Sequence, residues 1–209
     1  MLGLDGLDGL DRRRFIRLGG VTVATAAIVA ACVGDDEKKS ADETGTRRRS
    51  ENDATILRTA SSIEALAVEV YRTAIESDLV TTKTIADAAK LFQSQHQEHG
   101  ALFEAETENA AEPFTDPNPV LVDQLRPTID ALDSETGVIQ LAYDLEVVAA
   151  NTYQANVGSF DDNRLNQALM SVGGVEARHA ALLAASLGLP SVPSAFQVTD
   201  DALRPGTGI

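Results

Sequence analysis

Glu176 and His179 stand three positions apart within the largely apolar sequence VEARHAAL. Residues at this spacing lie on the same face of an α-helix. A carboxylate and an imidazole on one face can ligate the same metal ion. Many charged helices also carry such a pair by chance, so its meaning depends on the residues that the rest of the chain places opposite it.

Four segments with helical periodicity could supply these opposing residues: 54–79, 84–109, 135–157 and 164–187. In each segment apolar side chains recur at intervals of three, four and seven residues, which marks the face that should be buried. Titratable side chains lie on these same apolar faces, and in chain order they are Glu64, His96 and His99, Glu146, and Glu176 and His179. We therefore expect all six to point into the core.

The first two segments and the last two repeat the same pattern. His99 follows Glu64 by 35 residues, and His179 follows Glu146 by 33 residues. Each half thus supplies one inward carboxylate and then one inward imidazole on the following helix. Two such halves that face each other would converge on one site at the axis of a helical bundle.

Two tyrosines extend this repeat, because Tyr71 follows Glu64 by seven residues and Tyr153 follows Glu146 by seven residues. Both lie on the predicted buried faces. They can fill the core without any further role, or they can donate hydrogen bonds to a ligand carboxylate and so orient it.

The connection between the second and third helical segments is long and contains four prolines, which interrupt helices. Within it, residues 120–126 could form a short turn of helix. A connection of this length favours an overhead crossover rather than a tight hairpin. The sequence therefore predicts an all-α, four-helix bundle over residues 54–188, followed by a tail at 189–209 that is a loose strap or disordered.

This pattern resembles the ferritin-like superfamily, in particular the exported ferritin-like domain proteins of bacteria. Members of that family take one Glu from each of two helices and a Glu-x-x-His pair from each of the other two onto a di-metal centre. The resemblance implies that Glu64 and Glu146 are the single carboxylates, that Glu176 and His179 form one complete pair, and that His96 and His99 form the other. His96 departs from the pattern, since the family has Glu there.

This departure changes the chemistry expected of the site. Four carboxylates neutralise two divalent cations, whereas Glu64, Glu146 and Glu176 leave one positive charge. An imidazole also cannot bridge two metals as a carboxylate does. The site could hold an asymmetric pair of metals or a single metal, and its ligands suit Fe, Mn or Zn.

The N-terminal 31 residues have the features of an export signal. Arg12 and Arg13 precede an uncharged stretch at 18–31, too short to be a comfortable permanent membrane span, and the pair resembles a twin-arginine translocation motif. The stretch ends in Ala-Ala before Cys32, the only cysteine of the chain, which resembles the lipidation site of bacterial lipoproteins. An ordinary secretory signal with an incidental cysteine is the alternative.

Residues 32–53 are rich in charged and small polar side chains and are predicted to form a disordered tether. The formal net charge of -15 argues against a nucleic-acid partner. We therefore expect export by the twin-arginine route and a lipid anchor on the outer face of the membrane, in the cell envelope. The oligomeric state stays open, a dimer being possible.

The resemblance implies redox chemistry or reactions with O2 or peroxide at a carboxylate/histidine metal site, such as ferroxidase activity or peroxide removal. No residue in the sequence specifies a substrate. Two alternatives stay open: a non-enzymatic metal-binding or envelope stress protein, and a metal-free bundle with a structural or interaction role.

Overall fold

The computed structural model describes residues 50–108 and 110–209. The predicted signal at 1–31, with Arg12, Arg13 and the lipidation site Cys32 next to it, lies outside the described residues, as does most of the predicted tether.

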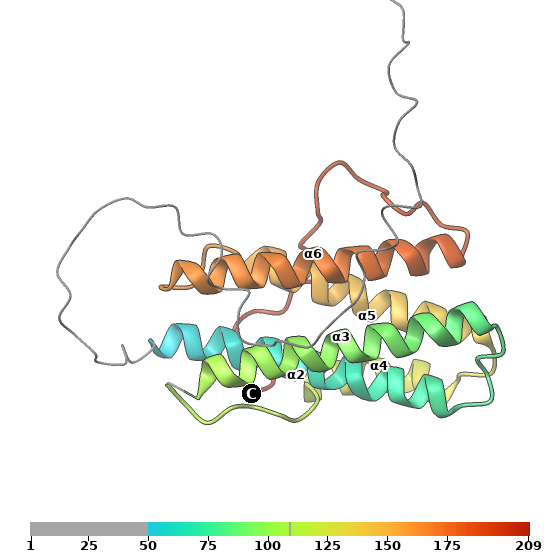
Figure 1. Cartoon of the computed structure of the whole chain (residues 1–209), viewed down its shortest axis with the longest axis horizontal. Helices are drawn as coiled ribbons and strands as arrows, with labels where there is room; N and C mark the ends of the chain where they lie inside the picture. Colours follow the sequence, from blue (N-terminus) through green and yellow to red (C-terminus); the bar gives the residue numbers. More distant parts are fainter. Residues whose placement is uncertain (1–49, 109) are drawn as a thin grey trace, which may run out of the picture. The chain divides into compact units, whose positions relative to one another are not determined.

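Five α-helices make up the regular structure of the described residues, where no strand occurs. Their bounds are α2 (Glu51–Glu76), α3 (Lys83–Thr107), α4 (Pro119–Asp130), α5 (Glu135–Asn156) and α6 (Asn163–Ser186). The predicted all-α fold is therefore confirmed. Helix α2 packs mainly against α3 and α5 mainly against α6, and the four helices run side by side as a bundle (Figure 1).

Helix α2 begins three residues earlier than the periodicity predicted. The side chain of Ser50 caps it by accepting a hydrogen bond from the backbone N–H of Asp53. The Asp53 carboxylate is buried and accepts from the backbone N–H of Asp161, in the turn before α6. Residues 50–53, which the sequence placed in the tether, therefore belong to the first helix and its packing.

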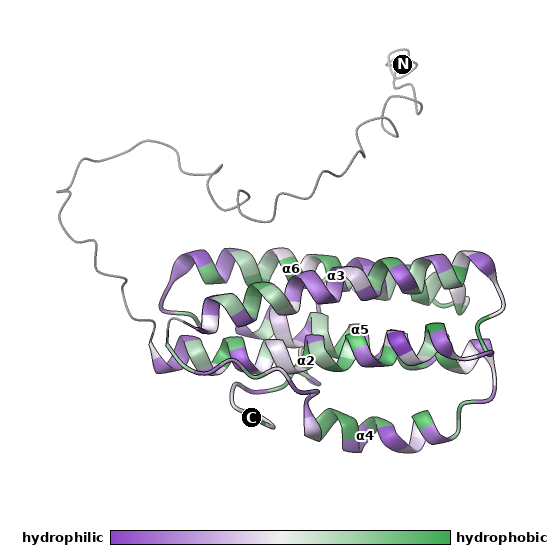
Figure 2. Cartoon of the chain, turned by 60° about the horizontal axis from the view of Figure 1, so that its bottom comes forward, coloured by the Kyte–Doolittle hydropathy of each residue, from purple (hydrophilic) through white to green (hydrophobic). Residues whose placement is uncertain are grey.

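Helix α4 lies within the crossover, on the outside of the bundle (Figure 2). It has 12 residues, so it is longer than the short turn predicted at 120–126. Asn118 caps it, with the side-chain oxygen accepting from the backbone N–H groups of Val120 and Leu121. The same buried Asn118 donates to Ser62 Oγ on α2, and so fixes the start of the crossover to the bundle.

The C-terminal tail forms an ordered strap along the bundle, rather than a disordered end. The backbone N–H of Leu203 donates to Thr152 Oγ1, and that of Gly206 donates to Thr59 Oγ1. Asn118 Nδ2 in turn donates to the carbonyl of Thr207. The strap thereby links α2, the crossover and α5.

Two apolar clusters fill the bundle around a group of buried polar side chains. The larger contains Leu57, Phe103 and Tyr153 among others, and the smaller contains Tyr71 and Phe92. No helix of the described residues has the length and apolar character that a membrane span requires. The buried polar side chains include residues of the predicted site.

Candidate metal centre

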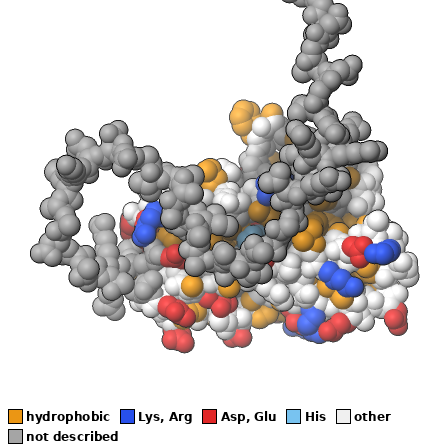
Figure 3. All heavy atoms as spheres, viewed as in Figure 1, with side chains coloured by type: hydrophobic (Ala, Val, Ile, Leu, Met, Phe, Trp, Pro, Cys, Tyr) orange, Lys and Arg blue, Asp and Glu red, His pale blue; other side chains and the backbone are white. Residues whose placement is uncertain are grey.

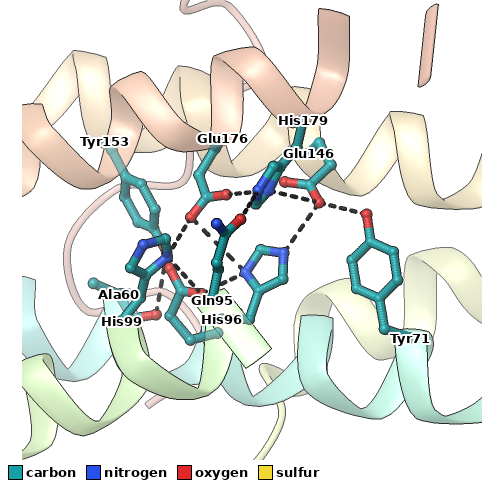
Figure 4. Close-up of polar contacts among 10 residues, drawn as sticks. Ala60, Tyr71, Gln95, His96, His99, Glu146, Tyr153, Glu176 and His179 are labelled. Carbon is teal, nitrogen blue, oxygen red and sulfur yellow. Dashed lines mark hydrogen bonds and ion pairs between the residues drawn. The ribbon is translucent and has the colours of Figure 1, made fainter. Parts of the chain in front are cut away.

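All six predicted ligands meet in the middle of the bundle (Figure 4). They come from the four long helices: Glu64 from α2, His96 and His99 from α3, Glu146 from α5, and Glu176 and His179 from α6. Five of them are at most 3% exposed, and His99 is 13% exposed. The helical periodicity thus identified side chains that are far apart in sequence and adjacent in space.

The donor atoms form two overlapping groups, each compact enough to surround one metal ion. The first group is Glu64, His96, His99 and Glu176, and the second is His96, Glu146, Glu176 and His179. Within each group the donor atoms lie within 4.8 Å of one another. Each half of the bundle therefore contributes to both groups.

Glu176 belongs to both groups and presents one oxygen to each. Its Oε1 lies 2.8 Å from His99 Nδ1, and its Oε2 lies 3.0 Å from His179 Nδ1. A carboxylate in this position could ligate a metal on either side and bridge two of them. The Glu176–His179 pair therefore lies at the centre of the site.

His96 is the other shared residue, and each of its ring nitrogens faces a different carboxylate. Nδ1 lies 2.7 Å from Glu64 Oε2, and Nε2 lies 3.0 Å from Glu146 Oε1. A neutral imidazole has only one nitrogen lone pair, so it can ligate a metal in one group while donating a hydrogen bond in the other. The two groups are therefore chemically unequal.

Tyr71 and Tyr153 hold the outer carboxylates in place from opposite ends of the cluster (Figure 4). The Tyr71 hydroxyl donates to Glu146 Oε1 at 2.5 Å, and the Tyr153 hydroxyl donates to Glu64 Oε1. Burial and the negative charges of the nearby carboxylates raise the pKa of both hydroxyls well above the usual value, so both stay protonated and keep donating.

Gln95 is a member of the site that the sequence argument missed. Its Oε1 lies 2.6 Å from Nε2 of His179 and can accept a hydrogen bond from it, which keeps a proton on Nε2. Nδ1 faces Glu146 and Glu176, so it carries the second proton of the charged imidazole when metal is absent, and it is the nitrogen that can bind a metal once that proton is lost. Gln95 precedes His96 and is rotated by about 100° from it on the helix, so a stripe of inward residues gives no signal for it.

Several buried nitrogen and oxygen atoms of the cluster, all of a kind that can ligate a metal, have no hydrogen bond within the described part of the chain. They are His99 Nδ1, His179 Nδ1, Glu146 Oε2 and both oxygens of Glu176. Some of these atoms lie within 3.0 Å of one another without the alignment of a hydrogen bond. Buried polar atoms normally have partners. A cation bound by Glu176, His99 and His179 would give their unpaired atoms a partner, so the residues present fit a metal.

The electrostatics of the cluster also favour a cation. Burial alone would raise the pKa of Glu64 and Glu146, but His96 and the other imidazoles outweigh it and lower both values. Burial and the charge of Glu64 raise the pKa of Glu176. Burial would lower the pKa of each histidine, yet the carboxylates raise all three, that of His99 to about 9. Without metal, protons therefore supply the positive charge.

Access to the cluster is from the side of α3. A histidine side chain is visible at the surface on the face drawn in Figure 3. His99 is the most exposed of the three histidines. Glu98, on the neighbouring position of the same helix, is exposed and makes no contact with the cluster in the described structure.

A helical bundle that gathers carboxylates and imidazoles from all four of its long helices belongs to the class of proteins that build their sites between facing helices. A family model, the ferritin-like domain, matches residues 52–189, which cover nearly all of the five helices. The chain belongs to this ferritin-like domain family. No curated protein and no solved structure matches the chain, so the assignment rests on the family model and the fold.

Proposed function

We propose that this protein binds one or two transition-metal ions in the centre of its bundle, with Fe or Mn as the expected metals and Zn as an alternative. The observation that supports this most strongly is Glu176, whose two buried oxygens lack aligned hydrogen bonds and face His99 and His179. Nitrogen and oxygen donors of this mixture suit all three metals.

The ligand set would divide between the two groups. Glu64 and His99 would hold one ion, Glu146 and His179 would hold the other, and Glu176 would serve both. Iron or manganese at this position would supply redox chemistry with O2 or peroxide, such as ferroxidase activity or peroxide removal. The apolar clusters around the site would keep bulk water away from it.

The metal content of the purified full chain tests this proposal. Elemental analysis after loading should give one or two ions per chain. Glu176→Gln should lower the content to below half, because both groups lose a carboxylate oxygen, whereas Glu98→Gln on the exposed side of α3 should leave it unchanged. Absence of stoichiometric Fe, Mn and Zn from the wild-type protein would show that the cluster is not a metal site.

Oxygen chemistry is tested separately from metal binding. A loaded protein that consumes O2 or peroxide, with loss of this activity in Glu176→Gln, would support an oxidoreductase. A loaded protein without such activity would support the non-enzymatic metal-binding function.

One observation favours a metal-free polar network as the second candidate. His96 already contacts Glu64 and Glu146 with its two nitrogens, and protonated it would neutralise much of their charge. In that case the bundle would have a structural or interaction role, and wild-type protein would remain metal-free after loading.

We also propose that the protein is exported through the twin-arginine route and anchored by a lipid on Cys32. Arg12 and Arg13, the uncharged stretch at 18–31 and the small residues before Cys32 support this. The anchor would hold the bundle at the membrane surface through residues 33–49. No nucleic-acid partner is proposed for so acidic a chain.

A further inference from the structure

A cavity lies beside the candidate metal centre, at the end of the bundle where α2 ends and α3 begins. Its volume is about 600 Å³, within the size range of sites for small organic ligands. Its walls come from all five helices and are mostly Leu, Ile, Val and Ala side chains. Such a cavity is a suitable site for an apolar molecule.

The cavity extends across the bundle. Val122 and Ile129 of α4 contribute to its wall, and so do Leu182 and Ser186 of α6. These two helices lie on opposite sides of the bundle in both ribbon views (Figures 1 and 2). A space that reaches from one side to the other suits an extended chain better than a compact ring.

A single layer of aromatic rings separates this cavity from the metal centre. Phe92 lines the cavity and stacks on His179 with ring centroids 3.9 Å apart. Tyr71 lines it as well, while its hydroxyl donates to Glu146 and its ring stacks on His96. One end of a bound molecule would therefore contact the side chains that support the candidate ligands.

The polar groups of the wall indicate what kind of head group the molecule has. Thr73, Ser77 and Ser186 line the cavity, and each hydroxyl already donates to a carbonyl of its own helix. In this arrangement their oxygens can accept a hydrogen bond from a ligand, although Ser77 Oγ already accepts one from the backbone N–H of Leu79. Thr73 and Ser186 are exposed, which places this polar rim at the openings.

The charges of the wall favour a neutral head group over an anionic one. Among the described residues that line the cavity, none is Lys, Arg or His, and the only charged residue is Glu69. The Glu69 carboxylate is paired with Arg72 outside the wall. A fatty-acid carboxylate only accepts hydrogen bonds, and it would find no cation among the described residues of the wall and three hydroxyls that already donate elsewhere.

We propose that this cavity binds a linear aliphatic molecule with a neutral, hydrogen-bond-donating head group, of which a long-chain primary alcohol is the simplest example. The aliphatic chain would occupy the space beside Phe92 and Tyr71, and the hydroxyl would donate to the oxygens at the rim. Binding requires no metal, so it is independent of the function proposed above.

Displacement of a neutral fluorescent probe tests this inference. The full chain, stripped of metal with a chelator, is titrated with N-phenyl-1-naphthylamine, which is then displaced by 1-decanol or by decanoate at pH 8. We expect saturable binding of one probe per chain, and displacement by decanol at a concentration at least tenfold lower than that for decanoate. Equal or better displacement by decanoate would overturn the proposed head group.

Variants that fill the cavity locate the binding. Ala89→Leu and Ala142→Leu add side-chain carbons to the wall, and the double variant should weaken probe binding at least tenfold. Ala105→Leu makes the same change at an exposed position of α3 and should leave binding unchanged. All variants retain the apolar stretch at 18–31, so probe binding to that stretch is common to them.

The single variants Ala89→Leu and Ala142→Leu are measured beside the double one, with circular dichroism as the check on folding. At least one folded, filled variant with weakened binding supports the proposal. Unchanged binding in the folded, filled variants, or no saturable binding by the wild type, would overturn it.

Discussion

At the scale of single residues, the site depends on groups that hold the ligands as much as on the ligands themselves. Tyr71, Tyr153 and Gln95 each make a hydrogen bond to one candidate ligand. Groups that orient ligands in this way commonly change metal affinity by 10- to 100-fold when removed. Their effect on metal affinity can be measured separately from their effect on folding.

Gln95→Ala should lower metal affinity by about 10-fold or more, because His179 would lose the acceptor that keeps its proton on Nε2. Gln95→Glu, which retains an acceptor, should restore much of it. Gln97→Ala, at an exposed position on the same helix, is the control. Competition with a chromophoric chelator measures the affinity, and equal values for the two alanine variants would show that Gln95 does not position His179.

The metal-free protein should lose stability as the pH rises from about 6.5 to above 9. The pKa of His99 is raised to about 9 by the carboxylates around it, so the folded state holds its proton where the unfolded chain with a pKa near 6.5 has lost it. The stabilisation is present in full below pH 6.5 and disappears as the pH passes 9, amounting to roughly 3 kcal/mol at most. The other two histidines shift in the same direction.

Urea denaturation of the chelator-treated protein at pH 6 and pH 9.5 measures this loss. In His99→Gln the difference between the two pH values should shrink. Equal stability of the wild-type protein at the two pH values would contradict the idea that protons on the histidines balance the carboxylates when no metal is bound.

The six candidate ligands could be predicted from the sequence because an inward face recurs with a fixed helical period. Glu64 and His179 are 115 residues apart, yet each is identified by its own helix alone. Gln95 could not be predicted, because its role depends on where α6 places His179 beside it. The shared position of Glu176 between two groups is likewise a property of how the helices pack.

At the scale of elements, α5 and α6 approach each other closely at Gly173, one of two adjacent glycines in α6. A Cβ on Gly173 would lie 3.1 Å from Tyr153 Cβ, whereas one on Gly174 would meet only the end of the Arg178 side chain, at 3.9 Å. Tyr153 is the residue that donates to Glu64. The packing at Gly173 therefore affects the position of the tyrosine that orients Glu64.

Gly173→Ala should destabilise the protein by about 1–3 kcal/mol, because the added methyl group forces α5 and α6 apart. Gly174→Ala should instead stabilise it by up to about 1 kcal/mol, through the helix propensity of alanine. Thermal denaturation of the two variants provides the comparison. Equal effects would mean that the helices accommodate the methyl group freely.

Asn118→Ala should cost about 2–4 kcal/mol, more than the loss of an ordinary helix cap. The buried side chain caps α4 and also donates to Ser62 Oγ and to the carbonyl of Thr207. Ser134→Ala removes a cap from α5 that has no such additional contacts, and should cost only about 1 kcal/mol. Denaturant unfolding of both variants tests whether Asn118 ties the elements together.

The helices could be predicted closely from the sequence, whereas for the tail the sequence left a loose strap and a disordered end as alternatives. Its residues are mostly Gly, Pro and small polar side chains, a composition that is typical of loose tails. What orders it are hydrogen bonds of the backbone at Leu203, Gly206 and Thr207 with distant side chains. Backbone groups look alike in every sequence, so composition contains no sign of these partners.

At the scale of the whole molecule, the described residues form a bundle with a polar centre and an apolar cavity beside it. The proposed lipid anchor would hold this unit near a membrane, where long-chain apolar molecules are abundant. The location proposed from the N-terminal sequence and the ligand class inferred from the cavity are thus compatible, although they rest on separate observations.

Cys32→Ala should release the protein from the membrane fraction, because the thiol that would carry the lipid is absent. Arg12→Lys combined with Arg13→Lys should instead prevent export, so that the protein stays inside the cell. Fractionation with immunodetection distinguishes these results. Membrane association of Cys32→Ala equal to that of the wild type would contradict lipid anchoring at this residue.

The strap also limits when folding can be completed during protein synthesis. The backbone N–H of Gly206 donates to Thr59 Oγ1 across 147 residues, and the carbonyl of Thr207 accepts from Asn118 Nδ2 across 89. These strap residues leave the ribosome after all five helices, so the hydrogen bonds that tie the strap to α2 and to the crossover can form only once they have emerged. A transport system that accepted only cargo with the strap in place would therefore act after translation has passed this point.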